Sequence, residues 1–185
     1  ANGVGGPVYA VDADTNGIGS LISPLAMPRL SADARFVVFE STGENLVPDD
    51  RNRVSDVFVR DLTTGAVEHI SARDPGLASL SPNGVSRLST SCASADGRWV
   101  AFASEADNLV GNDTNGFRDV YVRDLQSGTN VLGSVASNGF SGDNLSFEPA
   151  ISTDGRYIAF TSLAGNLVAG DTNRAYDVFA RDLLS

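Results

Sequence analysis

One string of residues recurs three times in the chain, and no other feature restricts its fold so strongly. Residues 50–61 read DRNRVSDVFVRD, residues 113–124 read DTNGFRDVYVRD, and residues 171–182 read DTNRAYDVFARD. The first two copies begin 63 positions apart and the last two begin 58 positions apart. A repeat at such a spacing is typical of architectures in which each copy is one supersecondary unit. The sequence therefore predicts three tandem copies of one module.

The residues before each string also agree among the copies. Aligned on Ser31, Ser94 and Ser152, the three copies continue into FVVFES, WVAFAS and YIAFTS. These runs are short, rich in aromatic and β-branched residues, and bounded by turn residues, which is typical of β-strands. The DVFVRDL-type runs have the same character, and Gly65 and Gly128 mark the hairpins that follow two of them. No stretch has a sustained helical period.

The turn before each aromatic run has its own signature. Asp96-Gly97 and Asp154-Gly155 predict tight turns, because glycine adopts the positive φ that such turns require. The first copy carries Asp33-Ala34 instead. Its turn is therefore expected to differ or to be strained.

Each unit is expected to form four antiparallel strands, and a repeated four-stranded sheet is typical of a β-propeller blade. The predicted fold is all-β, with blades over about 28–71, 91–135 and 149–183 in one domain of 185 residues. The Gly-, Ser- and Asn-rich links 72–90 and 136–148 carry the length beyond a minimal blade.

The strings SADGRWVAF, STDGRYIAF and DVFVRDL resemble the TolB-like β-propeller repeat family, whose units carry a Ser-x-Asp-Gly-x-aromatic core. The resemblance covers nearly the whole chain, in three copies that agree with one another. It implies a propeller. The family includes scaffolds, receptors and enzyme-attached domains, so the resemblance leaves function open.

The third unit reaches its last residues where its fourth strand is expected to begin. The opening residues match the end of a unit, so residues 7–12 are predicted to complete the last blade and remove an exposed sheet edge. Three blades are too few for a ring, since closed propellers use about four to eight. We therefore expect a homodimer of three-blade halves that closes head to tail into six blades, and the alternative is a piece of a longer propeller.

Composition excludes some classes of partner. The formal net charge is −10, and all thirteen basic residues are Arg. Nucleic acids and anionic membranes need a basic face, so neither is expected as a partner. No apolar run approaches the roughly 18 residues of a membrane span, so no membrane insertion is expected. Cys92 is the only cysteine, which rules out an intrachain disulfide and is expected to be buried.

The repeated string carries oxygen-bearing side chains in the pattern Asp-x-Asn-x-x-x-Asp. Ca²⁺ takes six to eight oxygen ligands, and no Cys or His lies nearby to favour Zn²⁺. One structural calcium ion per blade is therefore predicted, and the alternative is that these side chains only form turns. Asp12 to Gly17 also fits the first half of a calcium loop. The predicted ligands are Asp50, Asn52, Asp56, Asp113, Asn115, Asp119, Asp171, Asn173 and Asp177.

Other polar residues are interpreted as structural. The pairs Arg60-Asp61, Arg123-Asp124 and Arg181-Asp182 recur in every copy, so they are expected to bond backbone groups between blades rather than to catalyse a reaction. His69 is expected to be an exposed strand residue, because no nucleophile motif accompanies it. The aligned residues Phe36, Trp99 and Tyr157 are expected to pack in the core.

The predicted function is a non-enzymatic β-propeller scaffold or binding module, located in the periplasm or outside the cell. Its partner would be a protein or a glycan, with Arg87, Phe140 and Phe147 of the links as candidate contacts. One alternative is a carbohydrate-active hydrolase or lyase that uses carboxylates at the propeller centre. Another is an isolated or engineered half-propeller without activity. Repetition of the acidic constellations in every copy favours the non-enzymatic interpretation, but the sequence does not decide it.

Overall fold

The computed structural model describes residues 10–13, 28–48, 50–77 and 81–184. All regular elements in these ranges are β-strands, arranged in three antiparallel sheets. We call each sheet with its turns a blade. Among the residues described, no helix is long and apolar enough to cross a membrane.

The first two blades each have four strands in the order of the sequence. The first blade consists of β1 (Arg29–Leu30), β2 (Phe36–Ser41), β3 (Asp56–Asp61) and β4 (Val67–His69). The second consists of β5 (Ser86–Arg87), β6 (Trp99–Ser104), β7 (Asp119–Asp124) and β8 (Thr129–Leu132). The third consists, in the described part of the chain, of β9 (Ser146–Ile151), β10 (Tyr157–Ser162) and β11 (Asp177–Asp182).

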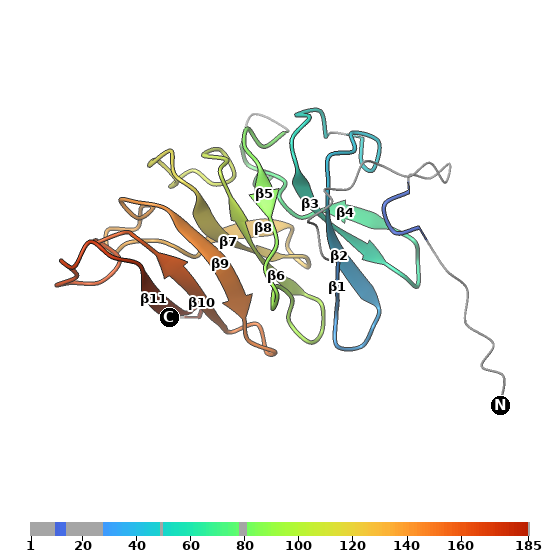
Figure 1. Ribbon diagram of the computed structural model, residues 1–185. Coiled ribbons are helices and arrows are strands. Elements are labelled where there is room, and N and C mark those ends of the chain that lie inside the picture. Colours follow the sequence, from blue (N-terminus) through green and yellow to red (C-terminus); the bar gives the residue numbers. More distant parts are fainter. Residues whose placement is uncertain (1–9, 14–27, 49, 78–80, 185) are drawn as a thin grey trace.

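The blades follow one another across the molecule in sequence order (Figure 1). Residues 10–13 lie beside the first blade, and β11 lies at the opposite end of the row (Figure 1). The predicted all-β fold of propeller blades is confirmed. Of the segment 7–12 that was expected to complete the last blade, residues 7–9 lie outside the described residues, and that expectation stays a prediction.

The first strand of the second and third blades begins earlier than the expected boundaries at 91 and 149. These strands start at Ser86 and Ser146, whose buried hydroxyls each lie 2.9 Å from a serine hydroxyl of the neighbouring strand. A small polar residue inside a polar link carries no strand signal, so pattern analysis did not find these starts.

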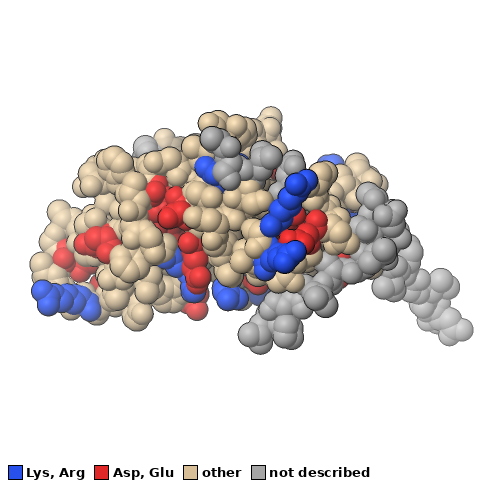
Figure 2. Space-filling view, turned by 90° about the horizontal axis from the view of Figure 1, so that it is seen from above, with Lys and Arg blue, Asp and Glu red and all other residues tan. Residues whose placement is uncertain are grey.

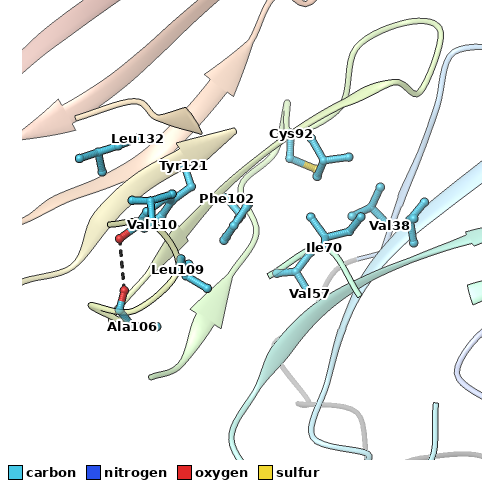
Figure 3. Close-up of a cluster of buried hydrophobic side chains, with 12 residues drawn as sticks. Val38, Val57, Ile70, Cys92, Phe102, Ala106, Leu109, Val110, Tyr121 and Leu132 are labelled. Carbon is cyan, nitrogen blue, oxygen red and sulfur yellow. Dashed lines mark hydrogen bonds between the residues drawn. The ribbon is translucent and has the colours of Figure 1, made fainter. Parts of the chain in front are cut away.

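The core lies between the blades. Val57 and Val59 of β3 are buried in one cluster with Phe102 and Tyr121 of the second blade. In Figure 3, residues of the first and second blades face one another across the gap between the two sheets. A second cluster joins the second and third blades in the same way. Each buried side chain of this size stabilises the fold by about 1.5–3 kcal/mol relative to an exposed one, so blade-on-blade contact supplies much of the stability.

The hairpin turn of each blade is built by one set of hydrogen bonds. In the second blade, Ser94 Oγ donates to Asp96 Oδ1 at 2.5 Å, and the N–H groups of Arg98 and Trp99 donate to Asp96 Oδ1 and Ser94 Oγ, each at 3.0 Å. The first and third blades make the same bonds. The Ser-x-Asp signature is therefore a turn motif.

The first blade keeps this turn without glycine. Gly97 and Gly155 have φ of 71° and 74°, and Ala34 has φ of 56°. A side chain at such a φ is strained. The strain expected from the sequence at Ala34 is confirmed.

Candidate functional site

The nine predicted calcium ligands lie in three equivalent loops and at the first residue of the strand that follows each loop, which is β3, β7 or β11. In every loop the Asn side chain reaches the last Asp. Asn52 Nδ2 donates to Asp56 Oδ2 at 2.8 Å, and the bonds of Asn115 to Asp119 and of Asn173 to Asp177 are 2.7 and 2.8 Å. The structure therefore brings together the second and third members of each predicted set.

The amide oxygen of each Asn is also engaged. It accepts the N–H of the residue two positions later, at 3.0 Å from Val54, 2.7 Å from Phe117 and 2.8 Å from Ala175. This is the local bonding of an Asx turn. Each Asn thus closes a turn and ties it to the start of the next strand.

The carboxylates at the strand starts are buried in the first two blades. Asp56 Oδ1 accepts the hydroxyl of Ser71 at 2.8 Å, and Asp119 Oδ1 accepts the hydroxyl of Ser134. Burial raises the pKa of Asp119 to about 7. Desolvation, and then the neighbouring Asp56, raise the pKa of Asp50 above its ordinary value.

The first Asp of each set differs between blades. Asp113 Oδ2 accepts the hydroxyl of Tyr121. Asp50 is 2% exposed, and its Oδ1 has no hydrogen-bond partner among the residues that the structure describes. In the third blade Asp171 is only partly buried.

A calcium ion in these loops would have to replace hydrogen bonds that the Asn amide oxygens and the Asp carboxylates at the strand starts already make. Among the residues described, no group of three or more His, Cys, Asp or Glu side chains is arranged to hold a metal ion. An ion would therefore depend on amide, backbone and water oxygens beside the carboxylates. Calcium binding by the nine residues stays a prediction.

His69 differs from its expected place. It is 8% exposed, its ring stacks on Phe58 at 4.9 Å, and its Nε2 lies 3.1 Å from Ser71 Oγ. The expectation of an exposed residue is wrong because His69 pairs with the buried Phe58 across β3 and β4. Leu132 is buried at the equivalent position of β8, so alignment of the copies could have indicated that His69 is buried.

The repeated arginines of the third strands join consecutive blades, as predicted. Arg123 Nη1 donates to the carbonyl of Ala72 at 3.4 Å, and Arg181 Nη1 donates to the carbonyl of Val135 at 3.1 Å. Each acceptor follows the outer strand of the preceding blade. Arg60 donates in the same way to the carbonyl of Ala13.

The third blade exposes the face that the other two blades bury. Val57 and Val120 are 0% exposed, and the equivalent Val178 is 79% exposed. Two neighbours on this face are at least partly exposed, Ala180 of β11 and its cross-strand partner Ala159. We call Ala159, Val178 and Ala180 the open face. Beside it lies a hollow of about 580 Å³, lined by Asp171, Asn173, Asp177, Val178, Phe179 and Ala180 among others.

The aligned aromatic residues show that the turn of the following blade covers this face in the first two blades. A Cβ placed on Gly97 would lie 2.4 Å from the Phe36 ring, and one on Gly155 would lie 2.2 Å from Trp99. The rings of Phe36 and Trp99 thus pack on the turn of the following blade, which confirms the packing role predicted for them. Tyr157 has the same place in the third blade but is 44% exposed, so its expected packing in the core is wrong for one chain, because no blade follows the third in the described part of the chain.

Two unrepeated carboxylates line an open hollow of about 470 Å³ between the inner strands. Glu40 is buried and accepts the N–H of Leu88 at 2.7 Å. Glu148 is exposed and has φ of 52°. The sequence analysis did not single out either residue, and only their lack of counterparts in the other copies could have marked them.

The three candidate contacts are largely accessible, although Arg87 lies in β5 and Phe147 in β9 rather than in a link. Arg87 is exposed, Phe140 is 49% exposed, and Phe147 is partly buried, packing edge-on against Tyr176 at 5.5 Å. On the face shown in Figure 2, acidic and basic side chains of the described residues lie close to one another. Contact of these residues with a partner stays a prediction.

No family model matches the chain, and no curated protein matches it. Among solved structures, it is similar to TolB from Acinetobacter baumannii at 18% identity and a TM-score of 0.48, over 91% of this chain and 31% of that chain. The tricorn protease matches at 15% identity and a TM-score of 0.45, over 84% and 14%. The β-propeller domain of the Trilobed protease from Pyrococcus furiosus matches at 17% identity and a TM-score of 0.29, over 86% and 56%. The chain therefore spans less than half the length of the TolB and tricorn chains.

Proposed function

We propose that the chain is a non-enzymatic β-propeller scaffold that assembles head to tail, with the open face of one copy covered by the first blade of a second copy. The observation that carries this proposal is the 79% exposure of Val178, at a position that is fully buried in the other two blades. The faces of the first two blades that are equivalent to the open face are each covered by the following blade within the chain.

The interfaces between blades within the chain indicate which surface is complementary to the open face. Where blades meet, the Val side chains of one third strand contact the large apolar side chains of the next blade, such as Phe102 and Tyr121. In the first blade the equivalent side chains are Phe39 and Phe58, which are 2% and 0% exposed and pack with Val11 and Val47 in one chain. A head-to-tail contact therefore places the open face against this cluster and its covering residues, and it forms a closed ring when the rotation per blade fits. Two copies give six blades, within the range of closed propellers.

The assembled ring is proposed to act as a binding module. Arg87 of β5 and Phe140 of the link 136–148 are both exposed and are proposed to contact a protein or glycan partner. Structural calcium in the Asp/Asn loops and a location in the periplasm or outside the cell belong to the same proposal, and separate experiments test them.

Light scattering after size-exclusion chromatography tests the assembly. Wild-type protein is expected at twice the 19.3 kDa mass of one chain. Val178→Asp puts a charge on the open face and is expected to give the mass of one chain, with a thermal unfolding curve that remains cooperative. Val131→Asp is the matched control, since Val131 is 38% exposed on the outer strand of the second blade. A wild type of single-chain mass at every concentration would refute the proposal.

A further inference from the structure

The hollow of about 470 Å³ between the inner strands is bounded by all three blades. Glu40 of β2 lines it from the first blade, residues 88–90 line it from the second, and Glu148 of β9 lines it from the third. Next to these lining residues, the N–H of Ile151 donates to the carbonyl of Ser91 at 2.8 Å, which joins the second and third blades. The hollow is therefore fixed by contacts between blades and does not depend on one loop.

Glu40 is a buried carboxylate with one oxygen left for a ligand. The residue is 7% exposed, and its Oε1 accepts the N–H of Leu88 at 2.7 Å. Among the residues described, its Oε2 makes no hydrogen bond or ion pair and stays accessible from the hollow. The other copies have Ala103 and Thr161 at this position, so the blade itself does not need a carboxylate there. Because burial of a charge without a partner costs free energy, a cation in the hollow would gain an interaction that the fold leaves open.

Glu148 lines the same hollow at a β-bulge. Glu148 and Pro149 together lie opposite the single residue Phe160 of β10, which shifts the register of the two strands. Proline has no N–H for the sheet and is found at such bulges, and bulges redirect side chains. Glu148 also has φ of 52°, an uncommon value for a residue with a side chain. The third blade thus interrupts its regular pairing where a carboxylate reaches the hollow.

We propose that this hollow binds a guanidinium or primary ammonium group carried on an aliphatic arm. The two carboxylates accept the N–H groups of the ligand in charge-assisted hydrogen bonds. Leu88, Pro149 and Ala150 line the same hollow and offer apolar surface to the arm. These lining residues belong to one chain, so binding does not require the head-to-tail assembly proposed above.

A divalent metal ion suits the hollow less well than an organic cation. Ca²⁺ takes six to eight oxygen ligands, whereas one of the two carboxylates is already bonded to the N–H of Leu88. Arg29 lines the hollow too, and its positive charge repels a doubly charged ion more strongly than a singly charged group. In the part of the chain that the structure describes, no three His, Cys, Asp or Glu side chains are arranged to hold a metal ion.

An NMR titration of the wild-type protein tests the proposal with two matched probes. N-acetyl-arginine amide carries a guanidinium as its only charge, and N-acetyl-citrulline amide is its uncharged counterpart. The arginine probe is expected to bind with a millimolar or tighter dissociation constant and to shift the amide signal of Leu88, and the citrulline probe is expected not to bind. Butylguanidine, which lacks the peptide groups, identifies the source of the ligand. Binding of butylguanidine alone supports a free small molecule, and binding of both cationic probes supports a side chain of a partner protein.

Three variants locate the binding. Glu40→Gln keeps an acceptor for the N–H of Leu88 and is expected to weaken binding of the arginine probe about tenfold, because a hydrogen bond to a charged group is lost. Glu148→Gln changes an exposed residue, which makes misfolding no explanation, and is expected to weaken binding about threefold. Glu44→Gln is the control, because it removes an exposed carboxylate that does not line the hollow.

Three results would overturn the proposal. The first is equal binding of the arginine and citrulline probes, or no binding of either cationic probe at millimolar concentration. The second is an equal loss of binding in Glu44→Gln and Glu40→Gln, since only the net charge of the chain would then attract the probe. The third is binding of Ca²⁺ that disappears in Glu40→Gln, which would assign the hollow to a metal ion.

Discussion

The repeated Ser-x-Asp motif folds the turn of every blade, and in the first blade it leaves Ala34 with a strained backbone. The Ser-x-Asp bonds fold the same turn in all three blades, so Ala34 adopts the positive φ that Gly97 and Gly155 adopt freely. The sequence predicts this strain, because three aligned copies reveal which one lacks glycine. It does not reveal that the glycines also make room for Phe36 and Trp99 of the preceding blades, since that contact joins residues far apart in the chain.

Ala34→Gly is expected to stabilise the fold by about 0.5–1 kcal/mol, since relief of the strained φ outweighs the extra entropy of a glycine in the unfolded chain. Urea denaturation of the monomeric Val178→Asp background measures this effect without a contribution from association. Ala66→Gly is the control, because Ala66 lies in an exposed turn without a positive φ. A loss of stability in Ala34→Gly would show that the turn is unstrained.

The ion pairs illustrate what alignment alone misses. Arg98 binds Asp124 through two bonds of 2.8 and 2.7 Å, and this contact lowers the pKa of Asp124 to about 2. The sequence singled out the Arg-Asp pairs as structural but did not pair their Asp with the Arg of the turn motif. The register of Trp99 opposite Asp124, which creates the pair, is known only once the hairpin is built.

At the scale of elements, the long strands are the most predictable part of the molecule. β2, β6 and β10 coincide with the three aromatic runs, and β3, β7 and β11 coincide with the DVFVRD-type runs. The short inner strands are less predictable because serine hydroxyl contacts, rather than β-propensity, place Ser86 and Ser146. The burial of His69 was not predicted for a related reason, because the residue on which it stacks belongs to the neighbouring strand.

The Asp/Asn loops carry the prediction on calcium. If each loop binds a structural ion, excess chelator is expected to lower the melting temperature, because a ligand of the native state stabilises by RT ln(1 + [L]/Kd). Asn115→Asp adds a carboxylate to the loop of the second blade and is the variant expected to increase the response to calcium. Equal melting temperatures with and without chelator, together with no metal in elemental analysis, would contradict calcium binding. The role of Asn115 would then be limited to the hydrogen bonds that it makes in the turn.

At the scale of the whole molecule, blade-on-blade packing accounts for both stability and assembly. Two internal interfaces bury the faces equivalent to the open face, and the exposed apolar residues Val168, Tyr176, Val178 and Leu184 gather in the third blade. The sequence predicted the module and its repetition, because both depend on local pattern. It did not show which faces stay exposed, since exposure depends on how the blades stack.

Site-directed cross-linking tests the central claim, the continuation of the internal packing from one copy to the next. Phe36 and Trp99 pack on the turns of the following blades, so Tyr157 of one copy is expected near Ala34 of the other, with its ring displaced because Ala34 carries a Cβ that Gly97 and Gly155 lack. Tyr157→Cys and Ala34→Cys proteins are mixed, with Cys92 replaced by Ser, and treated with a short bifunctional maleimide. A covalent dimer is expected from the mixture and none from either variant alone. Cross-linking of Tyr157→Cys with itself, or none in a mixture that is dimeric by light scattering, would contradict the claim.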